Sequence, residues 1–148
     1  MRKLIFISSS DYDSLKKKGV DQAILERVEG GLFQRVYSVH LFANITRKIV
    51  LDPSSILYEF GKDQLPWWKN RILFRLSAPL YFFLALFKLR RLIKRIDPDV
   101  VRVSDPFFSA LVCGFACLGL KPWVVSIHSD WDKRMELDGS KALPCILG

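Results

Sequence analysis

The sequence predicts an α/β fold, a parallel sheet with helices on both of its faces. Residues 97–132 read as strand, helix, strand and loop, and two apolar strands joined by a helix within about thirty residues form a βαβ unit with parallel strands. The apolar run 4–7 starts almost at the beginning of the chain, as a first central strand does in folds of this class. A chain of 148 residues, 50% of them hydrophobic, suffices for one domain with a substantial core and is short for two.

Short β-rich runs and one helical repeat account for most of the first half of the chain. Residues 20–29 place apolar side chains at helical spacing, and Gly30 and Gly31 end that helix. The runs 47–51 and 55–60 fit a pair of strands or one strand and an edge piece. The strands are expected, in chain order, at residues 4–7, 36–42, 47–51, 55–60, 99–103 and 123–127.

The helix of the βαβ unit has a start signal and small residues that allow close packing. Ser104 and Asp105 offer an N-cap acceptor, and Pro106 suits the first helical position. Residues 107–120 are almost wholly apolar, with small residues that let the helix lie close on a sheet, and residues 123–127 form a second strand of buried type. Asp105 is expected to cap the helix, with contact to a ligand as the alternative.

The polar loop at residues 8–19 argues against one class of cofactor. A dinucleotide site needs Gly-x-Gly-x-x-Gly here so that the backbone can approach a pyrophosphate, and this motif is missing. Binding of a nicotinamide or flavin cofactor is therefore not expected. The three lysines at 16–18 are either a solvated surface or contacts for a phosphate.

The positive charge of the chain is concentrated in one segment. Residues 64–96 contain eight basic residues and no acidic one, whereas basic and acidic residues balance at 15 each in the rest of the chain. Such a patch indicates an anionic partner such as phosphate, lipid headgroups or nucleic acid. Nucleic acid is the least favoured, because the aromatic residues here form one apolar run and do not alternate with basic residues.

The end of this segment predicts an amphipathic helix. Apolar residues recur at i, i+3, i+4 and i+7 from Leu89 to Ile96, with basic residues on the other face, and Pro79 predicts a kink or break before them. The twelve uncharged residues 76–87 are too few to cross a bilayer, which takes ~20. The helix either packs on the sheet with a solvated basic rim or lies at an anionic membrane surface. The residues expected to face such a membrane are Arg71, Arg75, Lys88, Arg91, Lys94 and Arg95.

The cysteines and histidines do not form a metal-binding pattern. The odd number of cysteines, three, in a sequence whose start lacks the apolar core of a signal peptide argues for a reducing, cytoplasmic compartment. Cys113 and Cys117 share a helix face without a further ligand at suitable spacing, so both are expected to be small buried hydrophobes. His40 lies inside a predicted strand and is expected to pack there, with a ligand role as the alternative.

Polar residues gather where the last predicted strand ends. Ligands bind beyond the carboxyl ends of the strands in open parallel sheets, and His128, Ser129, Asp130 and Asp132 follow that strand. An imidazole there can exchange hydrogen bonds with a sugar hydroxyl, or stabilise a diphosphate when protonated, and a structural histidine at a strand end is the alternative. The two carboxylates either orient the hydroxyls of a ligand or assist the removal of its proton, or they begin a turn and pair with the basic residues that follow.

These residues carry a family resemblance. The stretch Asp-Pro-Asp-Val-Val-Arg-Val-Ser-Asp-Pro-Phe, the small-residue helix after it and Val-Val-Ser-Ile-His-Ser-Asp-Trp-Asp-Lys-Arg resemble the amino-terminal domain of the family 4 glycosyltransferases over residues 97–138. The resemblance implies the GT-B architecture, two Rossmann-like domains that face each other across a cleft. Residues 1–148 would be the acceptor-side domain. The second domain, which in the family carries most of the nucleotide-sugar site, is not expected in this chain, so the chain is expected to be a truncated form, inactive alone.

The resemblance also implies a reaction and a site. The reaction is retaining transfer of a sugar from a nucleoside diphosphate sugar to a glycan or lipid-linked acceptor, as in the synthesis of cell-surface polysaccharides, with no metal or other cofactor. A histidine at the position of His128 contacts the donor sugar, and Gly19 takes the place of a glycine pair near donor and acceptor. With the residues above, the expected site has His128 and Asp130 for catalysis and Gly19, Asp105, Ser129 and Asp132 for substrate binding.

A second interpretation of the sequence is a Rossmann-like module without catalysis that binds an anionic membrane surface through residues 69–95. The protein is expected in the cytoplasm, and under this interpretation it would be a peripheral protein at the inner face of the membrane.

Overall fold

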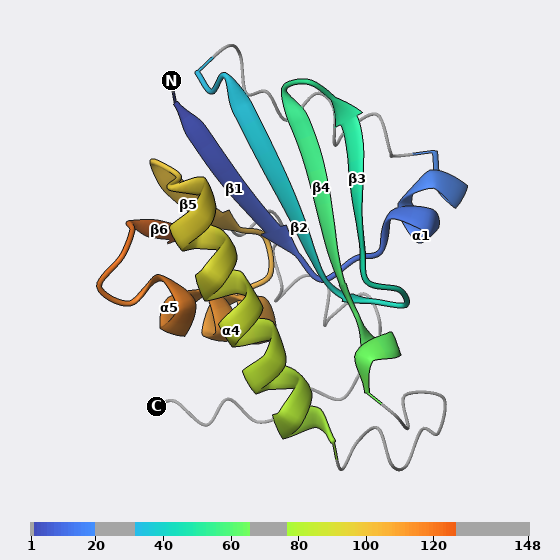
Figure 1. The fold of residues 1–148 in the computed structure, drawn as a ribbon. Helices are drawn as coiled ribbons and strands as arrows, with labels where there is room; N and C mark the ends of the chain where they lie inside the picture. Colours follow the sequence, from blue (N-terminus) through green and yellow to red (C-terminus); the bar gives the residue numbers. More distant parts are fainter. Residues whose placement is uncertain (1, 20–31, 66–76, 127–148) are drawn as a thin grey trace, which may run out of the picture.

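Six strands form one sheet in the computed structural model, which describes residues 2–19, 32–65 and 77–126 (Figure 1). The strands lie in the order β3-β4-β2-β1-β5-β6, and every neighbouring pair is parallel except β3 and β4, which are antiparallel. Their bounds are β1 Lys3–Ser8, β2 Arg35–Ala43, β3 Arg47–Asp52, β4 Ser55–Gly61, β5 Val100–Val103 and β6 Trp123–Val125. The predicted α/β class is confirmed, and the predicted parallel sheet forms except at β3, which is antiparallel to β4.

Two long helices lie together on one face of the sheet (Figure 1). The helices of the described residues are α1 Tyr12–Lys17, the 3₁₀ turn η2 Lys62–Gln64, α4 Ala78–Ile96 and α5 Phe108–Cys117. Helices α4 and α5 pack against every second residue along a strand, such as Ile5 and Ile7 of β1 and Val101 and Val103 of β5. The opposite face is also buried at its centre, where Val36 and His40 are 0% exposed. The helix expected at residues 20–29 lies outside the described residues.

Helix α4 follows the periodicity that the sequence shows. Leu89 and Ile93 are fully buried, with Leu92 and Ile96 nearly so, which confirms the predicted inner face. The expected kink or break at Pro79 takes the form of a helix start, because the proline lies in the first turn of α4, where its missing N–H costs no hydrogen bond. The helix ends at Asp97, which is left-handed with φ 53° and donates its N–H to the carbonyl of Ile93.

The loop expected at residues 8–19 contains the short helix α1. Its N-cap is Asp11, whose carboxylate accepts hydrogen bonds from the Ser14 backbone N–H at 2.8 Å and from the Ser14 hydroxyl at 2.8 Å. Desolvation raises the pKa of Asp11, but these two hydrogen bonds, together with the charges of His40 and Lys17, hold the pKa below its usual value. A helix of six residues with no buried side chain leaves no apolar repeat in the sequence, so composition alone suggested a loop.

The βαβ unit forms as predicted, with one correction. Strands β5 and β6 are parallel, and α5 between them buries Cys113 and Cys117, which confirms both as small packed residues. Helix α5 is shorter than the predicted 107–120. The prediction of a buried strand at 123–127 is wrong for its described part, because Trp123, Val124 and Val125 are 40%, 50% and 38% exposed. In the described sheet β6 is an edge strand, paired only with β5.

Candidate functional site

The carboxyl ends of the parallel strands meet in one row of polar residues. Ser8 at the end of β1 pairs in register with His40 of β2, and His40 pairs with Glu59 of β4. Ile7, Val103 and Val125 are paired across β1, β5 and β6, so the residues that follow them continue the row. We call this set the polar row; from β3 to β6 it consists of Arg47, Glu59, His40, Ser8, Ser104 and Ser126. One position before the polar row, strands β2, β1, β5 and β6 have the apolar residues Val39, Ile7, Val103 and Val125.

Three serines of the polar row lie on adjacent strands at the edge where ligands bind in such sheets. Ser104 donates its backbone N–H and its hydroxyl to the carbonyl of Ile7, at 3.0 and 3.2 Å. Ser126 donates its N–H to the carbonyl of Val103 at 2.7 Å. The Ser8 and Ser10 hydroxyls are 3.0 Å apart. The three serines follow paired positions of adjacent strands, and hydroxyls can both donate to and accept from a sugar or a phosphate.

A cation lies beside the serines. Arg102 of β5 donates from Nη2 to the hydroxyl of Ser126 at 3.0 Å, and its guanidinium lies 5.8 Å from the centre of the Phe6 ring. The side chain is only half-buried. The arginine thus places a positive charge next to the carboxyl edge, which favours an anionic group there.

The other end of the polar row is an ion-pair network that anchors α1. Glu59 is 2% exposed, accepts the backbone N–H of Tyr12 at 2.7 Å and forms an ion pair with Nε of Arg47. Arg47 also pairs with Asp13 at 2.8 Å, and both carboxylates raise the pKa of its guanidinium, that of Asp13 most. His40 lies 4.0 Å from Glu59 and is fully buried, which confirms it as a packed strand histidine. The network fixes the loop after β1 on β3 and β4.

Two of the predicted site residues lie in the described part of the chain. Asp105 accepts hydrogen bonds from the backbone N–H groups of Phe107 at 3.0 Å and Ser109 at 3.2 Å, one on each carboxylate oxygen. It therefore shapes the start of α5, as expected for a capping residue, although the helix begins at Phe108 and not at Pro106. Gly19 closes the turn after α1 with φ +68°, and no atom lies within 4 Å of where its Cβ would be. Direct contact of either residue with substrate stays a prediction.

The remaining predicted site residues lie outside the described residues: His128, Ser129, Asp130 and Asp132, together with Arg71 and Arg75 of the basic segment. His128 follows Ser126 by two positions in the sequence. Sequence reasoning missed Ser8, Ser126 and Arg102. The signal that could have found the two serines is that a serine directly follows an apolar core in both cases.

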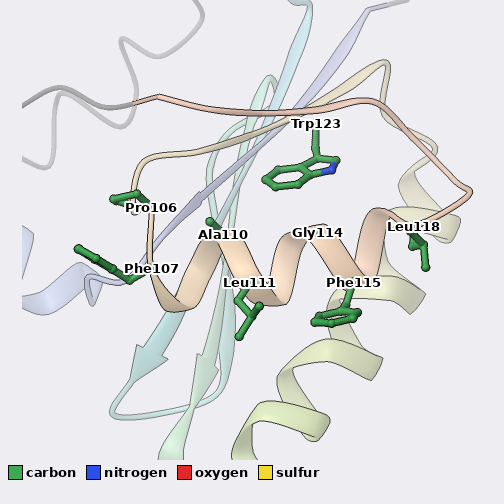
Figure 2. A pocket seen from close by; sticks show the side chains of 8 residues that line it. All are labelled: Pro106, Phe107, Ala110, Leu111, Gly114, Phe115, Leu118 and Trp123. Atoms are coloured by element: carbon green, nitrogen blue, oxygen red, sulfur yellow. The ribbon is translucent and has the colours of Figure 1, made fainter. Parts of the chain in front are cut away.

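An apolar groove of about 480 Å³ runs along the outer side of α5, and Figure 2 shows the side chains that line it. It starts at Pro106 and Phe107, next to the carboxyl edge, and the Trp123 indole lies over the helix near Gly114. A Cβ at Gly114 would come within 3.2 Å of that indole, so a larger residue here would require the ring to shift by a few tenths of an ångström. Phe107 and Leu118 are 67% and 70% exposed.

The basic residues of α4 are not equivalent. Arg91, Lys94 and Arg95 are exposed, and Lys88 is half-buried. Arg90 instead donates to the carbonyls of Ala116 and Leu118, each at 3.1 Å, and thereby satisfies the end of α5. Within the described residues, no group of three metal-ligating side chains comes together and no helix has the length and apolar character to cross a bilayer.

An α/β domain of this kind, with a mostly parallel sheet and a polar carboxyl edge, belongs to the Rossmann-like class. Within that class, the chain matches the model of Glycosyltransferase Family 4 over residues 13–144 and belongs to this family. The match confirms the resemblance seen in residues 97–138. Searches among curated proteins and among solved structures gave no match.

Proposed function

We propose that this chain is the acceptor-side domain of a glycosyltransferase that moves a sugar from a nucleoside diphosphate sugar to a glycan or lipid-linked acceptor. The membership of the family supports glycosyl transfer. The observation that carries the proposal is the polar row, whose hydroxyls on β1, β5 and β6 stand at the ligand-binding edge of the sheet beside Arg102.

The proposed roles follow from the chemistry of these groups. The hydroxyls and Arg102 hydrogen-bond sugar hydroxyls and the diphosphate, whose charge grows as the bond to the sugar breaks. His128 contacts the donor sugar, while Asp130 and Asp132 orient the acceptor. The transfer is retaining, with the acceptor attacking from the face that the diphosphate leaves, and it uses no metal. Ser129, Asp105 and Gly19 complete the substrate contacts.

A turnover assay tests this proposal. The chain is incubated with labelled nucleoside diphosphate sugars and candidate acceptors, by itself and joined to a second, nucleotide-sugar-binding domain. His128→Ala is expected to lower turnover by about ten-fold or more, the effect of losing a donor contact worth ~1.4 kcal/mol. Lys94→Ala, which changes an exposed residue of α4 outside the polar row, is the control and is expected to leave turnover unchanged. Equal turnover of His128→Ala and the parent protein would contradict the assignment.

We also propose, as a second function, that the chain attaches to the inner face of a membrane and so works from the cytoplasm. The exposed basic residues of α4 favour this attachment, because cationic side chains near a surface attract anionic lipids. Sedimentation with vesicles tests it: binding that rises with anionic lipid and falls with salt is expected. Failure to bind vesicles of either charge would remove this second function and leave the first untouched.

A further inference from the structure

We propose that a groove between α4 and β4 is a binding site for a phosphate group. The groove has a volume of about 230 Å³, nearly eight times the ~30 Å³ that one water molecule occupies in the liquid. Three cationic and three apolar or aromatic residues line it: Lys88, Arg91, Arg95, Tyr58, Phe60 and Leu92. This site would give the proposed membrane attachment a specific ligand, the phosphate of a lipid headgroup. The inference rests on that proposed attachment only for the source of the phosphate.

Spacing along α4 brings the three cations into one line. Lys88, Arg91 and Arg95 are three and four residues apart, so successive side chains stand one turn apart on the same stripe of the helix. The strand β4 runs beside this stripe and supplies the aromatic floor of the groove. A ligand in the groove would therefore meet cationic groups along its whole length.

The aromatic floor holds the cations in place. The Arg95 guanidinium lies 5.9 Å from the centre of the Tyr58 ring, and Lys88 Nζ lies 5.9 Å from that of Phe60. Lys48 of β3 adds a fourth positive charge, 5.8 Å from the Tyr58 ring. Cations that stack on aromatic faces lose less freedom when they bind an anion, because their side chains are already ordered.

The charge of the groove is largely uncompensated. In the described part of the chain, no carboxylate forms an ion pair with Lys88, Arg91 or Arg95. Lys88 donates a hydrogen bond to the side-chain oxygen of Gln64. Partial burial lowers the pKa of Lys88, and the negative charge of Asp63 offsets this only in part. The two guanidinium groups are therefore the stronger anion contacts, and their planar donor sets match phosphate oxygens in pairs.

The proposed ligand of the groove is a phosphate monoester or diester. Two kinds of molecule carry such a group: an anionic lipid, in its headgroup, and a soluble phosphate compound. A sulfonate or carboxylate would also be attracted but offers fewer oxygens in the arrangement that two guanidinium groups recognise. The groove is not the carboxyl edge: its lining comes from α4 and β4 alone and includes no residue of the polar row.

The test compares two variants that each remove one positive charge from α4. Arg91→Ala changes the groove, and Lys94→Ala changes an exposed residue that does not line it. The full chain is titrated with glycerol phosphate at constant ionic strength, with binding followed by NMR shifts of the Tyr58 and Arg95 signals. We expect Arg91→Ala to weaken binding by about ten-fold, Arg91→Lys to weaken it less, and Lys94→Ala to change it by less than about two-fold.

Vesicles of phosphatidylcholine with and without phosphatidic acid then distinguish the sources. Binding of both glycerol phosphate and phosphatidic acid vesicles, each weakened by Arg91→Ala, assigns the groove to a lipid headgroup. Binding of glycerol phosphate without vesicle binding assigns it to a soluble compound and overturns the membrane attachment alone. Vesicle binding that Arg91→Ala and Lys94→Ala weaken equally, without binding of glycerol phosphate, overturns the groove and leaves the attachment standing. Absence of both kinds of binding overturns both.

Discussion

The Tyr81 hydroxyl ties helix α4 to the carboxyl ends of two strands, and its removal should destabilise the domain. It donates to the carbonyl of Phe60 at 2.7 Å and accepts the backbone N–H of Phe42, also at 2.7 Å. Phe42 needs this support, since its backbone is left-handed with φ 62°. Tyr81 is 3% exposed, so water does not readily replace the hydroxyl.

The expected loss in Tyr81→Phe follows from these two bonds. A buried backbone group that loses its partner costs about 1–3 kcal/mol. Because the N–H of Phe42 is only partly buried and the carbonyl of Phe60 is buried, we expect about 3 kcal/mol in total. For a domain of this size that lowers Tm by about 6–12 °C. The matched control is Tyr58→Phe, which removes a hydroxyl from half-buried Tyr58 on β4 and should cost less than about 0.5 kcal/mol.

Alkaline pH provides a second readout for the same residue. Burial raises the pKa of Tyr81 from 10.0 to about 12, despite the hydrogen bond from Phe42 that lowers it. The folded state therefore holds this proton more tightly than the unfolded state, and the stabilisation is complete below pH 10 and is lost as the pH rises toward 12. This difference in pKa corresponds to about 3 kcal/mol.

Urea denaturation at pH 7 and at several pH values between 9 and 12 measures both effects. The free energy of unfolding of the parent protein should fall more steeply with pH than that of Tyr81→Phe, and the two should approach each other near pH 12. A variant as stable as the parent at pH 7, with an identical slope at alkaline pH, would refute the proposed role of the hydroxyl.

Three further predictions concern the packing around the site, and urea denaturation checks each of them. Gly61→Ala should cost about 3 kcal/mol or more, because its Cβ would lie 2.4 Å from the backbone nitrogen of Thr46; a cost below about 0.5 kcal/mol would contradict the close approach. Arg90→Ala should cost about 1–2 kcal/mol, since two carbonyls at the end of α5 lose their donor, whereas exposed Arg91→Ala should cost little. Glu59→Gln should cost about 1–3 kcal/mol, because it removes the charge that pairs with half-buried Arg47 at the start of β3, and equal stability would show that the network does not anchor α1.

Much of the sheet and the inner face of α4 could be predicted because their signals are local. The run at residues 4–7 is apolar and β-branched in part, and Leu89 to Ile96 repeat at the helical period. The exposure of β6 could not be predicted, because apolar composition is the same for a central strand and for an edge strand with one neighbour. Arg90 and Arg91 are adjacent in sequence, and only the position of α5 gives the first a structural role.

The candidate site was predictable only in part, because the polar row is a property of strand register. Ser8, His40 and Glu59 are 19 or more residues apart, and nothing in the sequence shows that they fall on one line across three strands. That the carboxyl ends of the strands meet at one edge could be predicted, since parallel strands bring these ends together whatever their register, and binding of a ligand there stays a prediction. The role of His40 as a packed histidine followed from local position and is confirmed, whereas Asp105 accepts backbone N–H groups at the start of α5 from a position upstream of the N-cap, which is Phe107.

Binding of a nucleoside diphosphate sugar at the carboxyl edge is tested most directly by mapping backbone NMR shifts of the labelled chain during a titration with such donors. The largest shifts are expected at Ser8, Ser104 and Ser126, with Arg35 and Val100 at the opposite edge unaffected. Largest shifts at the opposite edge, or no shift at the three serines with any donor at saturating concentration, would contradict a sugar-nucleotide site built on the polar row.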